Sequence, residues 1–459
     1  MIGGVGPPGG GGGATWGGGR AAFATNAQWP EPQQWCARAV RAERAAGAGR
    51  AGREGAGSGS DSEGEGHSAG TPSVGESLAP LLLHAALRGE REEVDALLEE
   101  GAPLEARVRS NGATALALAA AAGHTDTVEL LLRRGASLTA RDSAGASALC
   151  LAALRGQIET VRSLVENQPP GAREALLELS TPGGETALLA AVKMGHVEVV
   201  KFLLEQGADA AVAAKSLGGV GMVGLACRKN RLNLALFLLD CPGGDIEAAD
   251  ACGMRPLMHA CCSGNATIVG ALLARDPRPE LEARDAKGMT AILHAGLCGS
   301  ADIVRQLASK GCKIEATDKA GNGLAWYVAA SGDSEALKWL LERDMAFLNA
   351  RNAKGRTPIF AAIKCRRAEV VRALTGQGCS LEVQDQQGWT PLAWAAVNGL
   401  GDMADLLVSL GADLRAVDGD GNVPRQIAEG MGHRKVAALL AARARQVLTR
   451  LDGAEWEKK

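Results

Sequence analysis

Short clusters of apolar residues alternate with polar turns through most of the chain, and the clusters are of two kinds. The first kind, as at residues 114–120 and 186–192, is a Thr followed by Ala, Leu and Val. The second kind, as at residues 127–132 and 199–204, carries apolar residues at helical spacing. Both patterns predict short helices, and the small Ala residues of the first kind let neighbouring helices approach closely.

These helix pairs recur with a nearly constant period. Ten glycines in the polar turns are spaced 33 to 39 residues apart, and a period of about 33 residues is typical of solenoids, whose units stack on their neighbours. Eleven residues after each turn glycine comes a helix-ending residue, which is Gly in eight repeats and Asn230 or Arg366 in the other two. The ten turn glycines are Gly112, Gly145, Gly184, Gly219, Gly253, Gly288, Gly321, Gly355, Gly388 and Gly421.

The start of each first helix shows a capping pattern. Residues 357–360 read Thr-Pro-Ile-Phe, and residues 390–393 read Thr-Pro-Leu-Ala. Thr caps a helix by accepting a backbone N–H, and Pro fits the first helical position. In several turns an Asp three residues before the glycine predicts a turn closed by its own side chain. These features resemble the ankyrin repeat and its Thr-Pro-Leu-His signature, and the resemblance implies an all-α ankyrin-repeat solenoid of about eleven helix-turn-helix units.

The composition divides the chain into three parts. Residues 1–77 are rich in Gly, Ala and Ser, and we expect a disordered tail because such a segment buries too little apolar surface to offset the entropy of ordering. Residues 78–446 form the predicted ankyrin repeat domain, and residues 447–459 a short C-terminal tail. Within the first tail, residues 35–44 are either incidental or a short helical motif that binds a partner.

Two repeats depart from the pattern. The interval between Gly145 and Gly184 is six residues longer than 33, and it contains Pro169 and Pro170, which must interrupt a helix. The repeat that begins at Gly219 lacks the Thr cap and carries extra glycines, each of which costs about 1 kcal/mol relative to Ala inside a helix. We expect a weaker joint at this repeat.

Composition and charge exclude several classes of protein. The formal net charge of −3 gives no general attraction to nucleic acid. No stretch approaches the roughly twenty apolar residues of a membrane span. The first residues lack the basic start and apolar run of a signal peptide, so we expect an intracellular protein, cytoplasmic or nuclear. An organelle transit peptide stays open, because no acidic residue precedes Glu31.

The residues that most often carry chemistry have structural explanations here. Cys150, Cys261 and Cys298 are among the cysteines on first helices, where the repeat asks for small packing residues. Six of the seven histidines lie at two recurring repeat positions. No paired C-x-x-C motifs or assembled nucleophile and base are evident. We therefore expect no catalytic residue, no metal, no cofactor and no enzymatic activity.

The candidate site is a surface. The resemblance implies a concave binding face lined by the turns, or fingers, and by the ends of the first helices. Basic residues near the mid-repeat mark form two spots there, and they suit an acidic peptide or a phosphorylated segment; a solvated polar face is the alternative. Finger-tip residues follow the turn glycines, where we expect exposure, with Trp389 as an anchor. The candidate contacts are Arg155, Lys193, Arg228, Lys229, Met254, Met289, Arg356, Lys364 and Trp389.

These observations predict a non-catalytic protein–protein interaction scaffold or adaptor that binds a partner on the concave ankyrin surface. Two alternatives stay open: the substrate-recognition subunit of a ubiquitin ligase, and the regulatory subunit of a larger enzyme complex. Ankyrin surfaces bind unrelated targets through variable positions, so the sequence leaves the identity of the partner open.

Overall fold

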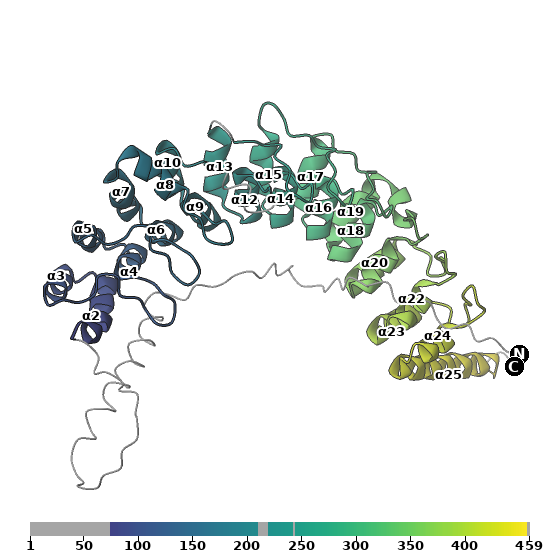
Figure 1. Ribbon diagram of the computed structural model, residues 1–459. Coiled ribbons are helices and arrows are strands. Elements are labelled where there is room, and N and C mark those ends of the chain that lie inside the picture. The colour runs from purple at the N-terminus through teal and green to yellow at the C-terminus, as the bar shows by residue number, and fades with distance from the viewer. Residues whose placement is uncertain (1–73, 210–218, 242–243, 457–459) are drawn as a thin grey trace, which may run out of the picture. The chain divides into compact units, whose positions relative to one another are not determined.

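The computed structural model describes residues 74–209, 219–241 and 244–456, and every regular element within these ranges is a helix. The helices occur in eleven pairs, as the period predicts (Figure 1). Three isolated β-bridges, such as that between Arg107 and Thr114, accompany them in the fingers. The predicted disordered tail, with its motif at residues 35–44, lies outside the described residues apart from its last four positions.

The first helices have seven or eight residues each, apart from α2, which has 15. These helices are α2 (Val74–Arg88), α4 (Ala115–Ala122), α6 (Ala148–Arg155), α9 (Ala187–Met194), α12 (Met222–Arg228), α14 (Pro256–Ser263), α16 (Ala291–Cys298), α18 (Leu324–Ser331), α20 (Pro358–Lys364), α22 (Pro391–Val397) and α24 (Pro424–Gly430).

The second helices follow after a turn. They are α3 (Arg91–Glu99), α5 (Thr125–Arg133), α7 (Ile158–Glu166), α10 (Val197–Glu205), α13 (Leu232–Asp240), α15 (Ala266–Leu273), α17 (Ala301–Ser309), α19 (Ser334–Arg343), α21 (Ala368–Gly376), α23 (Gly401–Ser409) and α25 (Arg434–Trp456). Two further elements, α8 (Pro170–Leu177) and the 3-10 helix η1 (Met345–Asn349), lie between pairs.

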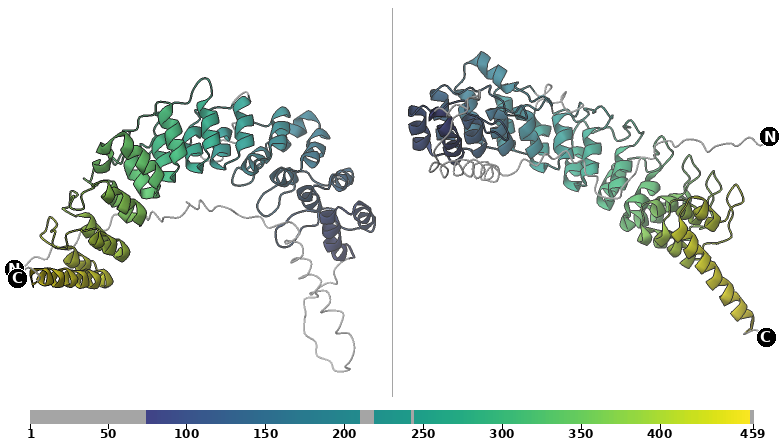
Figure 2. Two further views of the ribbon diagram at one scale, coloured as in Figure 1. Left: turned by 180° about the vertical axis from the view of Figure 1, so that it is seen from behind. Right: turned by 60° about the horizontal axis from the view of Figure 1, so that its bottom comes forward.

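The described chain divides into two compact units. The N-terminal unit runs to Cys298 and includes residues 302–313, and the C-terminal unit comprises residues 299–301 and the chain from Ile314 onward. In the N-terminal unit, first helices pack in the order α2, α4, α6, α9, α12, α14 and α16, and the second helices from α3 to α15 form another layer (Figure 2). In the C-terminal unit α18, α20, α22 and α24 pack in the same way.

The core of each unit runs through the first helices. Leu116 and Leu188 are 1% exposed, and the alanines between repeats, such as Ala120 and Ala191, are fully buried. Burying one Leu side chain contributes about 1.5–3 kcal/mol. Because no single pair holds enough apolar surface, this contribution depends on the neighbouring pair.

The predicted helix caps are present at three threonines, whereas the hydroxyl of Thr357 makes no cap hydrogen bond among the described residues. The hydroxyl oxygens of Thr114 and Thr186 accept hydrogen bonds from backbone N–H groups three residues later, each at 3.3 Å. Thr390 does the same at 3.2 Å. At the repeat expected to be weaker, Gly221 precedes α12 and supplies no side-chain cap.

Side-chain-closed turns, also predicted, shape the fingers. In one finger Asp385 Oδ1 accepts hydrogen bonds from the N–H groups of Gln387 at 2.9 Å and Trp389 at 3.0 Å. Neighbouring fingers are joined through their backbones, as where the N–H of Gln386 donates to the carbonyl oxygen of Lys354 at 3.0 Å. The same pair of bonds closes the turns at Asp142, Asp250, Asp285, Asp318, Asn352 and Asp418.

The break between α7 and α8 follows from the local sequence. Helix α7 ends at Glu166, and α8 begins at Pro170, where Pro occupies the first helical turn and its missing donor has no cost. The prolines therefore interrupt the helix as expected.

The last helix is longer than we expect from the sequence. Helix α25 runs to Trp456 and thus continues through position 447, where we placed the start of the C-terminal tail.

We expect Arg366→Gly to stabilise the protein. Arg366 and Asn230 have φ values of 55° and 57°, in the left-handed region, where a residue other than Gly costs about 1–2 kcal/mol. The free energy of unfolding should rise by about 1 kcal/mol, measured by urea denaturation followed by circular dichroism. The matched control, Gly264→Ala, adds a Cβ into open space at a φ of 73° and should lower stability. Equal stability of all three proteins would contradict this account.

Candidate functional site

Four cations gather at the carboxyl ends of α9 and α12, which pack against each other in the N-terminal unit. Lys193 lies in the last turn of α9 and Arg228 in the last turn of α12, where the helix dipole favours positive charge. Lys229 and Arg231 follow directly along the chain. We call these four residues the basic cluster. The packing of α9 against α12 brings these four basic residues together.

Their proximity is visible in the pKa of Lys229. Burial lowers this pKa below its ordinary value, and the positive charges of Arg228, Lys193 and Arg231 lower it further. Glu185 acts in the opposite direction, and its carboxylate already pairs with Lys193 across 2.9 Å between Nζ and Oε1. The basic cluster therefore holds four positive charges against one carboxylate.

The members of the basic cluster differ in how far the fold uses them. Arg228 and Lys229 are exposed, and within the ranges that the structure describes neither forms a salt bridge. Arg231 instead packs over Gly195, where an added Cβ would lie 2.7 Å from Arg231 Cδ. Its Nε is buried without a hydrogen-bond partner among the described residues. Arg228 and Lys229 are consequently the members best placed to meet a ligand.

The position of Arg231 has a structural role throughout the chain. At the matching position of other repeats, Nε2 of His124, His196 and His433 bonds to a carbonyl oxygen of the preceding repeat at 3.0 to 3.1 Å. Arg367 does the same through Nε, which donates to the carbonyl oxygen of Ala330 at 3.1 Å. The structural interpretation of these three histidines is confirmed.

Two other basic candidates lie at the ends of other first helices. Arg155 is half-buried at the end of α6. Lys364 is exposed at the end of α20, in the C-terminal unit. Each unit thus presents basic residues at the carboxyl ends of its first helices.

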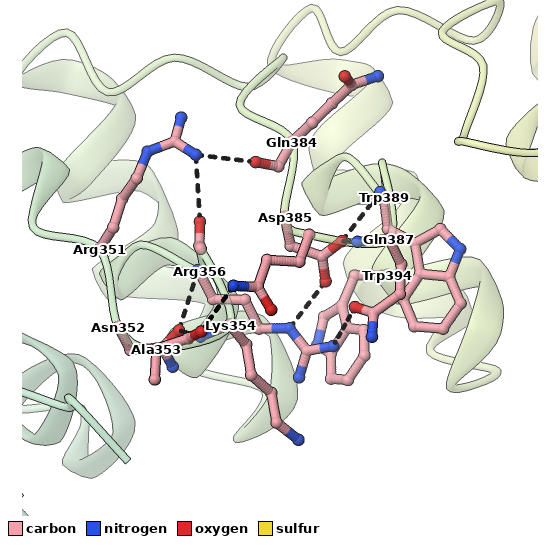
Figure 3. Close-up of polar contacts among 12 residues, drawn as sticks. Arg351, Asn352, Ala353, Lys354, Arg356, Gln384, Asp385, Gln387, Trp389 and Trp394 are labelled. Carbon is pink, nitrogen blue, oxygen red and sulfur yellow. Dashed lines mark hydrogen bonds and ion pairs between the residues drawn. The ribbon is translucent and has the colours of Figure 1, made fainter. Parts of the chain in front are cut away.

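A second candidate surface lies on the fingers of the C-terminal unit, around Arg356 (Figure 3). Arg356 Nε pairs with Asp385 Oδ2 at 2.8 Å, and its guanidinium carbon lies 3.8 Å from the ring centroid of Trp394. The Arg356 side chain is 11% exposed and that of Asp385 is fully buried. We expected an exposed finger-tip cation; that expectation is wrong, because the ion pair and the cation–π contact hold the side chain inward.

Trp389 follows the glycine of this finger and is half-buried. Its ring centroid lies 5.7 Å from that of Trp394, which in turn meets Phe360 edge-on at 6.5 Å. The expectation of a fully exposed Trp is therefore too strong, because the ring gains by packing on its aromatic neighbour. Part of Trp389 still faces solvent at the end of this aromatic stack (Figure 3).

The two candidate methionines are less exposed than expected. Met289 is 2% exposed, so its assignment to the exposed finger tips is wrong. An apolar side chain of this size gains about 1.5–3 kcal/mol when it leaves water, and here it does so within the finger. Met254 is half-buried.

Two buried histidines on first helices bond to finger aspartates. His259 Nε2 lies 3.1 Å from Asp250 Oδ2, and His294 Nε2 lies 3.0 Å from Asp285 Oδ2. Burial lowers the pKa of both imidazoles below the ordinary value, and the aspartates offset this shift in part. Both rings are thus neutral near pH 7.

Sequence reasoning missed one contact made by these rings. Cys262 Sγ lies 3.4 Å from His294 Nδ1, between the neighbouring first helices α14 and α16. The separation of the two residues by about one period was the available signal, but the helical phase had to be known before the contact could be seen.

No group of three or more His, Cys, Asp or Glu side chains suited to a metal ion occurs among the described residues. None of the helices in the described ranges is both long and apolar enough to cross a bilayer.

Comparison with known proteins identifies the repeats. A family model described as ankyrin repeats (3 copies) matches residues 66–142, 140–214, 223–318 and 324–418. The chain is 34% identical over 113 residues to Ankyrin repeat domain-containing protein 63 of Homo sapiens, which covers 24% of this chain and 30% of that protein. It is 31% identical over 96 residues to Protein phosphatase 1 regulatory subunit 27 of Mus musculus, which covers 21% of this chain and 62% of that protein.

A third similarity is shorter relative to its protein. The chain is 30% identical over 136 residues to the Nuclear factor NF-kappa-B p105 subunit of Gallus gallus, which covers 29% of this chain and 14% of that protein. The matched segments thus span less than two thirds of each of these relatives.

We expect the folded protein to lose stability in acid, in part because His259 becomes protonated. Its pKa in the folded state lies below its ordinary value of 6.5, so the unfolded chain binds the proton more readily. The stability contribution is complete above that value and is lost as pH falls below it. Melting temperatures at about pH 7.5 and about pH 5 should show a smaller acid loss in His259→Gln, which keeps an N–H for Asp250. An unchanged acid loss would count against this role.

Proposed function

The chain belongs to the ankyrin-repeat family, and on that premise we propose that it is a scaffold or adaptor that binds an acidic or phosphorylated protein segment. Ankyrin repeats indicate protein–protein interaction, and proteins of this family and regulatory subunits are generally non-catalytic. The binding face in this proposal is the concave ankyrin surface, formed by the fingers and the carboxyl ends of the first helices within residues 78–446.

The observation that carries the proposal is the excess of positive charge in the basic cluster. Like charges that lower the pKa of Lys229 make this arrangement unfavourable in the free protein. An anionic ligand would reverse the effect, because each new opposite charge favours the protonated Lys. Carboxylates and phosphates also form charge-assisted hydrogen bonds with Arg, which are about twice as strong as neutral ones.

The proposed contacts around the basic cluster are Arg155, Lys193, Arg228 and Lys229. Arg228 and Lys229 are exposed and are expected to make the direct contacts. Arg155 and Lys193 lie at the ends of α6 and α9, which pack in sequence toward α12, so the four side chains follow three successive first helices. A peptide in extended conformation suits such a row, because its acidic side chains recur along the direction of the stack.

The proposed contacts on the C-terminal unit are Trp389 and Lys364, each treated as a separate surface. Trp389 combines a solvent-facing edge with a ring fixed on Trp394. A fixed aromatic side chain loses little conformational entropy on binding, which is why Trp is frequent in binding hot spots. Arg356 supports this surface as a residue that positions Trp394 and does not itself reach outward.

One observation favours the alternative of a regulatory subunit. A relative that is 31% identical over 96 residues is itself named a regulatory subunit of protein phosphatase 1. A regulatory subunit and an adaptor would use the same binding face, so mass spectrometry of proteins retained from native lysate separates them. Retention of a phosphatase catalytic subunit would favour the regulatory subunit. Retention of ubiquitin-ligase subunits would favour the ligase alternative, and retention of neither would favour the adaptor.

We expect the double variant Arg228→Glu, Lys229→Glu to bind acidic and phosphoserine peptides at least about tenfold more weakly than the natural chain. The measurement is fluorescence anisotropy with a panel of matched phosphorylated and unphosphorylated peptides. The control variant Lys310→Glu, Lys313→Glu changes two exposed lysines of the same unit by the same charge and should keep the affinity. Equal affinities for all three proteins would exclude the basic cluster as the site.

We expect Trp389→Ala to remove a subset of the proteins retained from lysate. The loss of a hot-spot Trp typically costs more than about 2 kcal/mol of binding free energy. The control is Trp339→Ala, because Trp339 is also half-buried but lies on second helix α19 under Arg343. If both variants retain the same proteins as the natural chain, the finger surface around Trp389 is not a contact.

A further inference from the structure

Four side chains of the N-terminal unit form a continuous polar chain that the binding function does not use. Cys298 Sγ lies 3.4 Å from the carbonyl oxygen of Cys262, Cys262 Sγ lies 3.4 Å from His294 Nδ1, and His294 Nε2 lies 3.0 Å from Asp285 Oδ2. The two cysteines are on neighbouring first helices, α14 and α16, which pack against each other. The chain thus begins at a buried carboxylate and ends at two exposed thiols.

The finger turn fixes the direction of this chain. Asp285 Oδ1 accepts the N–H groups of Lys287 and Met289, each at 2.8 Å. Oδ2 is therefore the oxygen that meets His294, and a carboxylate accepts, so Nε2 carries the proton. Burial keeps the ring neutral by lowering its pKa. Nδ1 then carries a lone pair that faces Cys262 Sγ. This nitrogen is placed to accept the thiol proton.

The two thiols are neighbours, because Cys298 Sγ reaches the backbone carbonyl oxygen of Cys262. The neighbouring Cys262 thiol lowers the pKa of Cys298 below its ordinary value, although burial acts in the opposite direction. The Cys298 thiol and burial raise the pKa of Cys262, so Cys298 loses its proton first. Both residues are exposed. A thiolate that reaches solvent beside a second thiol is the arrangement of oxidation-sensitive cysteines.

Two other cysteines on first helices of this unit lack these features. Cys261, adjacent to Cys262 in sequence, is fully buried, and burial raises its pKa. Cys227 on α12 is buried as well, and burial raises its pKa to about 12. A buried thiol with a raised pKa is inert toward oxidants. Packing alone thus accounts for Cys261 and Cys227 but not for the pair Cys262 and Cys298.

We propose that Cys262 and Cys298 form a peroxide-reactive dithiol site, with His294 as the base, that closes to a disulfide between α14 and α16. In the first step the Cys298 thiolate attacks one oxygen of a hydroperoxide, and the O–O bond breaks. Cys298 becomes a sulfenic acid, and the other oxygen leaves as an alcohol or water after taking a proton.

In the second step His294 Nδ1 removes the proton from Cys262. The Cys262 sulfur attacks the Cys298 sulfur and forms the S–S bond, and the hydroxide of the sulfenic acid leaves with that proton as water. Two thiols thereby lose two electrons and the hydroperoxide gains them. The carboxylate of Asp285 stabilises the imidazolium that exists between these events, so it acts as a positioning residue.

The disulfide would join two repeats that otherwise touch only through packing and hydrogen bonds. Cross-linking removes conformational freedom mainly from the unfolded chain, so it raises the stability of the folded state. Oxidation would therefore tighten the joint between α14 and α16.

The test uses the full chain, reduced and then treated with hydrogen peroxide in the presence of a chelator. Non-reducing peptide mapping by mass spectrometry should show a linked Cys262–Cys298 peptide pair, with Cys261 unmodified. Exposed Cys252 is the internal reference, because it lies in a finger without such neighbours among the described residues. Cys298 should react at least about tenfold faster than Cys252. Equal rates, or the absence of the linked pair, would overturn the proposal.

Two variants separate the steps. In Cys262→Ser the sulfenic acid of Cys298 cannot be resolved, so a sulfenic-acid probe such as dimedone should label Cys298 persistently. In His294→Gln the first step should proceed while closure of the disulfide slows. Circular dichroism of each variant checks that it is folded. Labelling of Cys262→Ser at Cys252 in place of Cys298 would refute the assignment, even if His294→Gln fails to fold.

Discussion

The fold depends on the finger carboxylates, and at Asp250, Asp285, Asp318 and Asp385 the two oxygens bond in different directions. Oδ1 accepts two backbone N–H groups and closes the turn, as at Asp385. Oδ2 then bonds to a side chain on a helix or in the preceding finger. Asp250 bonds to His259, Asp318 accepts from the hydroxyl of Tyr327 at 2.6 Å, and Asp385 accepts from Arg356. A buried carboxylate without partners would be strongly destabilising, so these fingers favour a donor side chain opposite Oδ2.

This constraint separates residues used by the fold from residues left for function. From the sequence, Arg356 and Arg231 cannot be told apart from Arg228. In the structure Arg356 is held by a finger carboxylate, and Arg231 packs over a mid-repeat glycine. Arg228 and Lys229 meet no such demand and stay exposed. Arg228 and Lys229 are consequently the members of the basic cluster that the repeat does not need, which is the property expected of binding residues.

The same constraint gives His294 its chemical character. Because Asp285 holds Nε2, the other ring nitrogen is fixed as a lone pair that faces Cys262. In the neighbouring repeat His259 is held in the same way by Asp250. The two histidines therefore differ in what lies beyond the ring, and this difference arises from the packing of α14 against α16.

The sequence by itself determined the repeat, the helix pairs, the Thr caps and the side-chain-closed turns, because these depend on residues a few positions apart along one chain. The period identified Asn230 and Arg366 as helix-ending residues, and the structure shows that both have a left-handed φ. Only the tertiary structure decided that Met289 is buried, that Arg356 points inward and that Cys262 meets His294. Those outcomes depend on how a side chain of one repeat fits the next, and a one-dimensional pattern fixes the spacing of repeats but not the phase in which their surfaces meet.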